Sequence, residues 1–125
     1  MSLASDPVFT THPWHLDART AALEPDDLPL AKVRAGSPST ASRELVCDPA
    51  TGLSIGIWEH TAGESVDVEA DEVFVVLSGR ATITYEDGSA AHIGPGSVVA
   101  TPSGVATTWT VHEDLRKVYV VREPS

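Results

Sequence analysis

The segment Gly63–Thr107 reads GESVDVEADEVFVVLSGRATITYEDGSAAHIGPGSVVATPSGVAT. Short runs of valine, isoleucine, threonine and aromatic residues alternate in it with glycines, which is typical of antiparallel strands joined by tight turns. Two spacings stand out, because Glu72 precedes Gly79 by seven residues and Gly96 precedes Pro102 by six. A chain of many short strands without long helices predicts an antiparallel β-sandwich or barrel.

The same pattern extends beyond this segment in both directions. The predicted strands are Leu53–His60, Glu72–Leu77, Ala81–Tyr85, Ala91–Ile93, Ser97–Thr101, Thr107–Val111 and Lys117–Val121. Asp87-Gly88 follows Tyr85 and predicts a β-hairpin, since a two-residue primed turn needs positive φ angles. We therefore predict an all-β fold.

The first 50 residues differ in composition and are rich in Pro, Asp, Ser and Thr. We expect an extended N-terminal arm with short strands, which belongs to the same domain as a barrel over residues 51–125. A weak helical signal is confined to Ala18–Leu23. The apolar residues expected to hold the arm down are Val8, Phe9, Trp14, Leu28, Leu30 and Val33.

The strand Glu72–Leu77 is apolar on both faces after its first residue. A strand with one face in water would alternate between apolar and polar residues. Phe74 and Val76 are predicted to face the barrel interior, so a cover is needed over the residues between them, Val73, Val75 and Leu77. The arm, a second subunit or both can provide it, and we expect a homodimer.

Bulk properties restrict the partners of this chain. Its 125 residues suffice for one domain with a buried core. Its net charge of −10 opposes binding to nucleic acid or anionic lipid, and no apolar run approaches the roughly 20 residues of a membrane span. The one cysteine, Cys47, rules out an internal disulfide. Together with the lack of a secretory signal pattern, this predicts a cytoplasmic protein.

A set of short motifs extends from Ile57 to Val121. They are Ile57-Trp58-Glu59, Leu77-Ser78-Gly79-Arg80, Glu86-Asp87-Gly88, Gly94-Pro95-Gly96, Pro102-Ser103-Gly104, Trp109-Thr110-Val111 and Arg116-Lys117-Val118-Tyr119. With Glu72, this text resembles the small single-domain cupins related to the ethanolamine-utilisation cupin and to ureidoglycine aminohydrolase domains. The resemblance implies an antiparallel double-stranded β-helix, the jelly-roll barrel of the RmlC-like cupin superfamily.

The resemblance also locates the positions at which cupins bind metal. In the family pattern two histidines precede the position of Glu72, and a third stands at Thr107. Depending on loop length, the histidine pair is replaced here by Ser65 and Asp67 or by Val66 and Val68. A metal site needs three or four converging ligands, and only Glu72 is retained. We therefore expect no cofactor and no bound transition metal.

A metal site of another composition is the alternative, because hard cations accept carboxylate ligands. Its ligands would be Asp67, Glu69 and Glu72 with either His60 or His92. A metal-dependent oxygenase is the weakest functional hypothesis, because the family's ligand set is incomplete in this chain.

Glu72 is the first candidate for catalysis. By strand parity it shares the face of Phe74 and Val76, so its carboxylate points into the barrel, where it could act as a general acid or base. The structural alternative is that Glu72 begins the strand, is half solvated, and pairs with Arg80 or Lys117.

Lys117 and Tyr119 are the other catalytic candidates, because they share one face of the last predicted strand. Parity alone does not tell which face of that strand points inward. If Lys117 points inward, it can neutralise Glu72 or bind a substrate carboxylate. If it points outward, it belongs with Arg116 to a solvated edge.

Five further residues are candidates for lining a ligand pocket. They are Trp58, His60, Phe74, Thr107 and Trp109. Trp58 and His60 share one strand face, and Thr107 and Trp109 share another. Two indoles at a barrel mouth would form a flat apolar surface with N–H donors, although tryptophans in a small barrel also serve as core residues.

The functional prediction is therefore a protein that binds a small polar organic molecule in its barrel without a transition metal. Acid–base chemistry by Glu72 would make it an enzyme of the lyase, isomerase or hydrolase kind. The alternative is a non-catalytic sensor or carrier of a small metabolite, in which Trp58 and Trp109 supply affinity.

Overall fold

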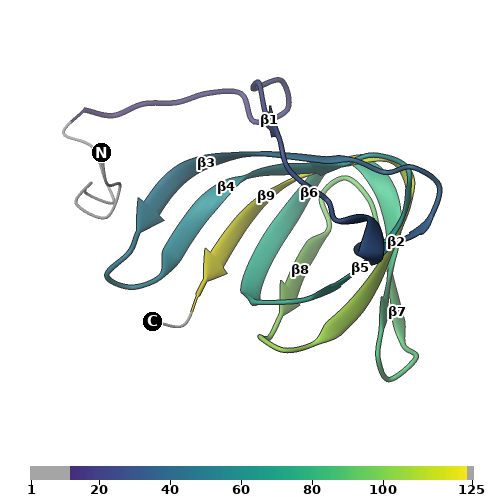
Figure 1. The fold of residues 1–125 in the computed structure, drawn as a ribbon. Helices are drawn as coiled ribbons and strands as arrows, with labels where there is room; N and C mark the ends of the chain where they lie inside the picture. The colour runs from purple at the N-terminus through teal and green to yellow at the C-terminus, as the bar shows by residue number, and fades with distance from the viewer. Residues whose placement is uncertain (1–11, 124–125) are drawn as a thin grey trace.

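The computed structural model describes residues 12–123, which form one nine-stranded antiparallel sheet that curls into a barrel (Figure 1). Its elements are β1 (Glu24–Pro25), η2 (Leu30–Lys32), β2 (Val33–Ala35), β3 (Thr40–Asp48), β4 (Leu53–His60), β5 (Gly63–Val68), β6 (Asp71–Tyr85), β7 (Ala90–Ile93), β8 (Val98–Thr101) and β9 (Ala106–Arg122). The all-β prediction is confirmed. In these residues no helix has the length and apolar character needed to cross a membrane.

The two long strands β6 and β9 form the spine of the barrel. They pair with each other from Asp71 opposite Arg122 to Tyr85 opposite Thr107. The first half of β9 also pairs with β5, and its second half pairs with β4. On the other edge, β6 pairs with β8 near its start and with β7 near its end. Each long strand therefore contributes to both halves of the curled sheet.

These long strands differ from the sequence prediction, which placed a strand boundary at Gly79. Glu72–Leu77 and Ala81–Tyr85 are parts of the single strand β6, in which the register shifts around Ser78 and Arg80. Gly79 has a φ of 87°, and a Cβ there would collide with the backbone of Asp114 on β9. The glycine permits a bulge at which β6 bends while its pairing with β9 continues. The predicted strands at the end of the chain likewise join into β9.

The hairpin predicted at Asp87-Gly88 connects β6 to β7. Gly88 has a φ of 88°, while no non-glycine residue among those described has a positive φ. The turn is therefore not the two-residue primed type. Its loop is longer, with Tyr85 accepting from the N–H of Gly88 and the Asp87 carboxylate accepting from Ser89. A type I turn followed by a left-handed glycine satisfies the same twist.

The core lies on the inner face of the sheet. Phe74 and Val76 are each 1% exposed, which confirms their predicted inward direction. They pack with Ile83, Trp109 and Leu115 from the far half of the barrel. Together these side chains form the buried core of the barrel, and Trp109 also lines a cavity beside it.

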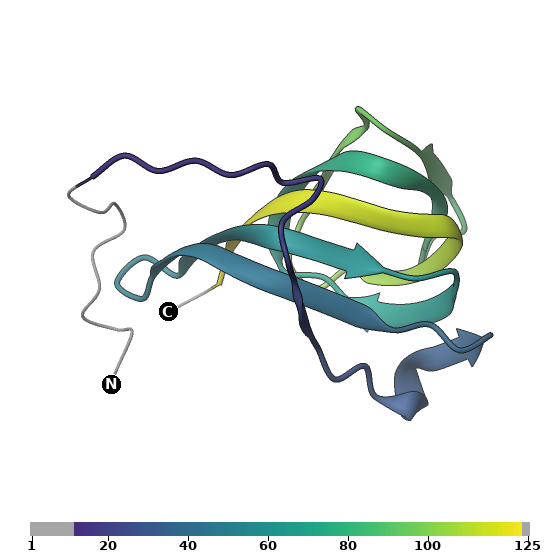
Figure 2. The ribbon, with the colours of Figure 1, turned by 90° about the horizontal axis from the view of Figure 1, so that it is seen from above.

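The N-terminal arm crosses the outside of the barrel (Figure 2). The Arg116 guanidinium on β9 donates hydrogen bonds to the carbonyls of Ala18 and Ala21, which fastens the arm to this face. The weak helical signal at Ala18–Leu23 forms a turn and then extended chain instead of a helix. Val8 and Phe9, expected to hold the arm down, lie outside the described residues.

The strand β3 lies within the first 50 residues, yet it pairs with β4 from Thr40 opposite His60 to Asp48 opposite Leu53. Residues 40–48 are therefore a full strand of the barrel sheet, and the sequence division at residue 50 does not coincide with a division of the fold. The arm proper ends where β3 begins.

Candidate functional site

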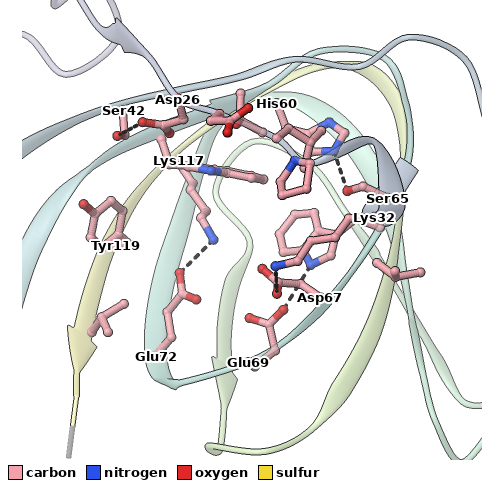
Figure 3. Close-up of a pocket in the computed structure, with 18 residues that line it drawn as sticks. Asp26, Lys32, Ser42, His60, Ser65, Asp67, Glu69, Glu72, Lys117 and Tyr119 are labelled. Atoms are coloured by element: carbon pink, nitrogen blue, oxygen red, sulfur yellow. Dashed lines mark hydrogen bonds and ion pairs between the residues drawn. The ribbon is translucent and has the colours of Figure 1, made fainter. Parts of the chain in front are cut away.

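A cavity of about 350 Å³ opens into the barrel between β3, β4, β5, β6 and β9 (Figure 3). Its lining includes most of the predicted site residues: Trp58, His60, Glu72, Trp109, Lys117 and Tyr119. Strand alternation explains how they meet, because Lys117 lies opposite Trp58 on β4 and opposite Val76 on β6. The cavity is thus built by side chains from strands that are far apart in the sequence.

An ion pair between Lys117 and Glu72 occupies the cavity wall. The Nζ of Lys117 lies 2.7 Å from the Oε2 of Glu72, and the two side chains are only 7% and 9% exposed. This settles the direction of the last strand, since Lys117 faces inward and Arg116 faces outward. Glu72 is therefore paired with Lys117, one of the two partners that a purely structural role for Glu72 would require.

Three aromatic rings surround the same ammonium group. The Nζ of Lys117 lies 4.1 Å from the ring centroid of Phe74, 4.5 Å from that of Trp58 and 4.9 Å from that of Trp109. The two indoles meet edge to face, with centroids 5.4 Å apart. Cation–π attraction to each ring stabilises a positive charge at this point, in addition to the carboxylate of Glu72.

Glu69 is a second carboxyl group in the cavity, and the sequence interpretation considered it only as a metal ligand. Its Oε1 accepts a hydrogen bond from the Thr107 hydroxyl at 2.7 Å and another from the Trp109 indole N–H at 3.4 Å. Burial raises the pKa of Glu69 above its ordinary value, and the hydrogen bonds and Lys117 oppose that rise. Glu69 follows the end of β5, where strand parity no longer predicts direction, so sequence alone gave no signal for its place.

Phe74 and Thr107 were expected to line the cavity, and the structure places them behind its wall instead. Phe74 is covered by the Lys117 ammonium and Trp109. The Thr107 hydroxyl is taken up by Glu69, and its side chain is 3% exposed. Both face inward as parity predicts, but larger side chains lie between them and the open space.

His60 is fully buried in the cavity wall. Its Nδ1 lies 2.6 Å from the carbonyl oxygen of Thr61, which can only accept, so Nδ1 carries the hydrogen. The Nε2 then accepts from the Ser65 hydroxyl at 2.8 Å. Burial lowers the pKa of His60, which keeps the ring neutral. Both ring nitrogens are thus engaged within the protein.

Tyr119 lies on the cavity wall beside Gly56 of β4. A Cβ at Gly56 would overlap the Tyr119 hydroxyl, so the glycine provides the space that this ring occupies. Burial raises the pKa of Tyr119, chiefly because the phenolate would lose its hydration. The phenol is therefore suited to donating or accepting a hydrogen bond and poorly suited to acting as a base.

The arm completes the mouth of the cavity, which the sequence did not predict. Asp26 accepts a hydrogen bond of 2.8 Å from the Ser42 hydroxyl on β3. The Nζ of Lys32 in η2 lies 3.0 Å from the Oδ1 of Asp67 on β5. These contacts hold the segment from Asp26 to Lys32 along the opening (Figure 3).

The residues present do not fit a transition metal. Glu72 is paired with Lys117, the Ser65 hydroxyl with His60, and Thr107 with Glu69. Over residues 12–123 no three His, Cys, Asp or Glu side chains converge as a metal would require. The alternative ligand set of carboxylates and a histidine is therefore not assembled in this structure.

The strands that build this cavity lie largely within a segment that matches a known family. Residues 48–119 match the EutQ-like cupin domain. The chain belongs to the EutQ-like cupin family. The fold is accordingly the cupin barrel that the sequence resemblance implied.

Relatives of this EutQ-like cupin are known in sequence and in structure. An uncharacterized protein of Streptomyces coelicolor is 37% identical over 76 residues, which are 58% of this chain and 71% of the relative. A protein of unknown function from Pseudomonas syringae pv. tomato has a TM-score of 0.75 at 29% identity, over 85% of this chain and 46% of that one. An ethanolamine utilization protein Q of Salmonella typhimurium has a TM-score of 0.60 at 20% identity, over 67% and 69% of the two chains. At that identity the last comparison supports the fold alone.

Proposed function

We propose that the barrel cavity binds a small polar organic molecule without a bound transition metal, and that a carboxyl group of its wall performs acid–base chemistry of the lyase, isomerase or hydrolase kind. The observation that carries the proposal is the Lys117 ammonium, fixed in the wall of a cavity of about 350 Å³. This volume is at the lower end of the range for ligand sites, so it suits a molecule of metabolite size.

The chemistry of the wall supports this class of ligand. Lys117 is a hydrogen-bond donor that can bind an oxygen atom of the molecule, and Trp58 and Trp109 offer apolar surface beside it. Glu69 and Glu72 provide carboxyl groups within the same space. A molecule with a polar head and a small apolar part would satisfy each of these groups.

A non-catalytic sensor or carrier is the second candidate. The pairing of Glu72 with Lys117 favours this role. Two buried charges that neutralise each other can bind a ligand without taking part in a reaction. Turnover distinguishes the two candidates, since both require a ligand in the cavity.

Thermal-shift measurements across a library of small metabolites, followed by turnover assays on the hits, test the proposal. We expect a hit to raise the melting temperature and to change the fluorescence of Trp58 and Trp109. The Lys117→Met variant should lose both effects. The absence of any hit whose binding depends on a cavity residue would contradict the proposal, and binding without turnover would assign the carrier role.

We further propose that the protein is a homodimer, paired through the outer face of the sheet. Val73, Val98 and Val120 lie on neighbouring strands of this face and are 47%, 70% and 40% exposed. The described part of the arm therefore leaves part of this apolar face uncovered. A second copy of the chain would bury it, as in a symmetric interface that uses the same patch twice.

A further inference from the structure

We propose that Glu69, and not Glu72, exchanges a proton with the bound molecule, and that this molecule is a small carbonyl or carboxylate compound whose oxygen is bound by Lys117. The inference rests on the proposed function, because it requires a ligand in the barrel cavity. It deepens that function by separating the roles of the two cavity carboxyls and by naming the ligand's chemical class.

Glu72 is poorly placed for proton exchange. Its Oε2 lies 2.7 Å from the Nζ of Lys117, and both side chains are more than nine-tenths buried. Among residues 12–123, Glu72 is the only carboxylate within ion-pair distance of the Lys117 ammonium, so loss of its negative charge would leave that ammonium buried without a counter-ion. The negative charge of Glu72 thus serves as the standing counter-ion of Lys117.

Glu69 has a different set of contacts. Both of its hydrogen bonds, from Thr107 and from Trp109, reach the same oxygen, Oε1. Across residues 12–123, no hydrogen bond or salt bridge to its Oε2 is found, and no buried side-chain oxygen in this part of the chain lacks a partner. The Oε2 atom is therefore accessible, and Glu69 lines the cavity (Figure 3). One oxygen anchors the carboxyl while the other is available to a ligand.

The charges around Glu69 make proton uptake easier than in an ordinary carboxyl. Burial is the largest cause of its raised pKa, and the negative charge of Glu72 adds to it. Lys117 and the donors Thr107 and Trp109 act in the opposite direction. Tyr85, the last residue of β6, also interacts electrostatically with Glu69, but its phenol carries no charge at neutral pH. The net effect is a carboxyl that can hold its proton nearer to neutral pH.

Lys117 supplies the complementary interaction with the ligand. An ammonium has three N–H donors, and Glu72 accepts one of them. A carbonyl or carboxylate oxygen that entered the cavity beside Lys117 could accept another. Because Lys117 and Glu69 line the same cavity, an atom adjacent to that oxygen could reach Glu69. Charge that develops on the oxygen during proton transfer would then face the ammonium.

The proton-transfer step balances without any further reactant. With Glu69 ionised, its Oε2 takes a proton from the carbon next to the ligand's carbonyl, and the C–H electron pair becomes the enolate whose oxygen faces Lys117. The O–H bond of Glu69 then breaks, the proton returns to the same or a neighbouring atom of the ligand, and the electron pair stays on the carboxylate. Thr107 and Trp109 hold Oε1 in place throughout.

Pyruvate is a suitable probe, because it carries a carboxylate and a carbonyl next to an exchangeable methyl group. In deuterium oxide we expect the wild-type protein to catalyse deuterium incorporation into the methyl group, as measured by proton NMR. Glu69→Gln should reduce that rate about 100-fold, the scale of general acid–base catalysis, while leaving pyruvate binding intact. The amide oxygen of glutamine can still accept from Thr107 and Trp109, which preserves the wall.

Glu64→Gln is the matched control. Glu64 also accepts a hydrogen bond from a β9 threonine hydroxyl, that of Thr110 at 2.8 Å, but it does not line the cavity. This variant should keep the wild-type exchange rate. Equal loss of exchange in both variants, or unchanged exchange in Glu69→Gln, would overturn the role of Glu69.

The binding role of Lys117 is tested with Glu72→Gln/Lys117→Met, a pair that removes both charges together and so keeps the barrel neutral. Tryptophan fluorescence should show that pyruvate binding is lost in this variant, and binding that persists would overturn the ligand class. A third measurement needs no ligand: the side-chain carbon signal of Glu69 in protein labelled with 13C-glutamate should titrate above 4.5, the ordinary value. Titration at or below 4.5 would reject the proposal. If Glu69 titrates as expected but no molecule binds, the proposed function has failed on its own.

Discussion

The Nζ of Lys117 lies 2.7 Å from the Oε2 of Glu72, inside a barrel in which the centroids of three aromatic rings also lie within 4.9 Å of the same ammonium. A buried ion pair recovers its desolvation cost only when its geometry is good and its remaining polar atoms are satisfied. Here the rings take the place of further polar partners. The pair therefore gives the cavity wall a positive group that is held at a fixed position.

Breaking this pair should cost more than removing it. We expect Lys117→Met and Glu72→Gln each to lower the free energy of unfolding by about 3 kcal/mol, because each leaves a buried charge or acceptor without its partner. The double variant should lose less than the sum of the two, which a double-mutant cycle by denaturant unfolding would measure. Additive losses would show that the two groups do not depend on each other.

The free energy of unfolding should depend on pH in a way that reflects the raised pKa of Glu69. Because its pKa is raised in the folded state, the stability it contributes is fully present below pH 4.5 and is lost as pH rises through the folded-state pKa. Glu69→Gln removes this group, so its stability relative to wild type should rise with pH across that window. Urea unfolding at several pH values measures the difference. A difference that is constant with pH would contradict this account.

His60 should affect the pH dependence of stability in the opposite direction. Its pKa is lowered from 6.5 by burial, so the stability it contributes is present above pH 6.5 and is lost as pH falls through the folded-state pKa. The contributions of Glu69 and His60 both appear in the pH dependence of the wild-type free energy of unfolding. Comparison of wild type with Glu69→Gln cancels the His60 contribution and isolates that of Glu69.

Substitution of two glycines can distinguish the cost of backbone strain from the cost of a steric collision. Gly79 and Gly88 have nearly the same φ, 87° and 88°, but a Cβ meets the backbone of Asp114 at the first and open space at the second. Gly88→Ala should therefore cost about 1–2 kcal/mol, the cost of a left-handed alanine. Gly79→Ala should cost about 2–5 kcal/mol, since overpacking adds to the strain. Thermal unfolding of both variants tests the difference, and equal costs would reject the steric explanation.

The proposed homodimer predicts the effect of charges on the outer face. We expect light scattering at micromolar concentration to show a dimer for the wild type and a monomer for Val98→Arg, because the arginine would place charge in an apolar interface. Val68→Arg is the matched control, since Val68 on β5 is 64% exposed but away from this face. A monomeric wild type would remove the proposal and leave the arm as the only cover of this face.

We also expect the purified protein to contain no stoichiometric transition metal. The groups that would have to bind one are engaged with each other, Glu72 with Lys117 and His60 with Ser65. Elemental analysis after purification in metal-free buffers measures this directly. Manganese, iron, nickel or zinc that is present in near-equimolar amount and resists dialysis would contradict the expectation.

Local pattern was sufficient for several parts of this fold. The inward direction of Phe74 and Val76 follows from the alternation of a strand, and the hairpin at Gly88 follows from a residue that tolerates positive φ. These are properties of a few consecutive residues, so they can be recognised without knowledge of the partners. The cupin barrel was implied by the resemblance of short motifs in the sequence to a known family, and the match of residues 48–119 to that family supports it.

The tertiary structure decided the features that depend on which strands become neighbours. Alternation allowed Lys117 to point inward or outward, and a solvated position was the default for a lysine. Only the register of β9 against β4 and β6 placed it inside. Gly79 resembled a turn in the sequence, whereas contact with Asp114 makes it a bend within one strand. Glu69 follows the last residue of β5, so its direction was set by Thr107 and Trp109 from a strand nearly 40 residues away. Side chains brought together by pairing at such distances cannot be assigned from periodicity, because periodicity describes a strand by itself and not its neighbours.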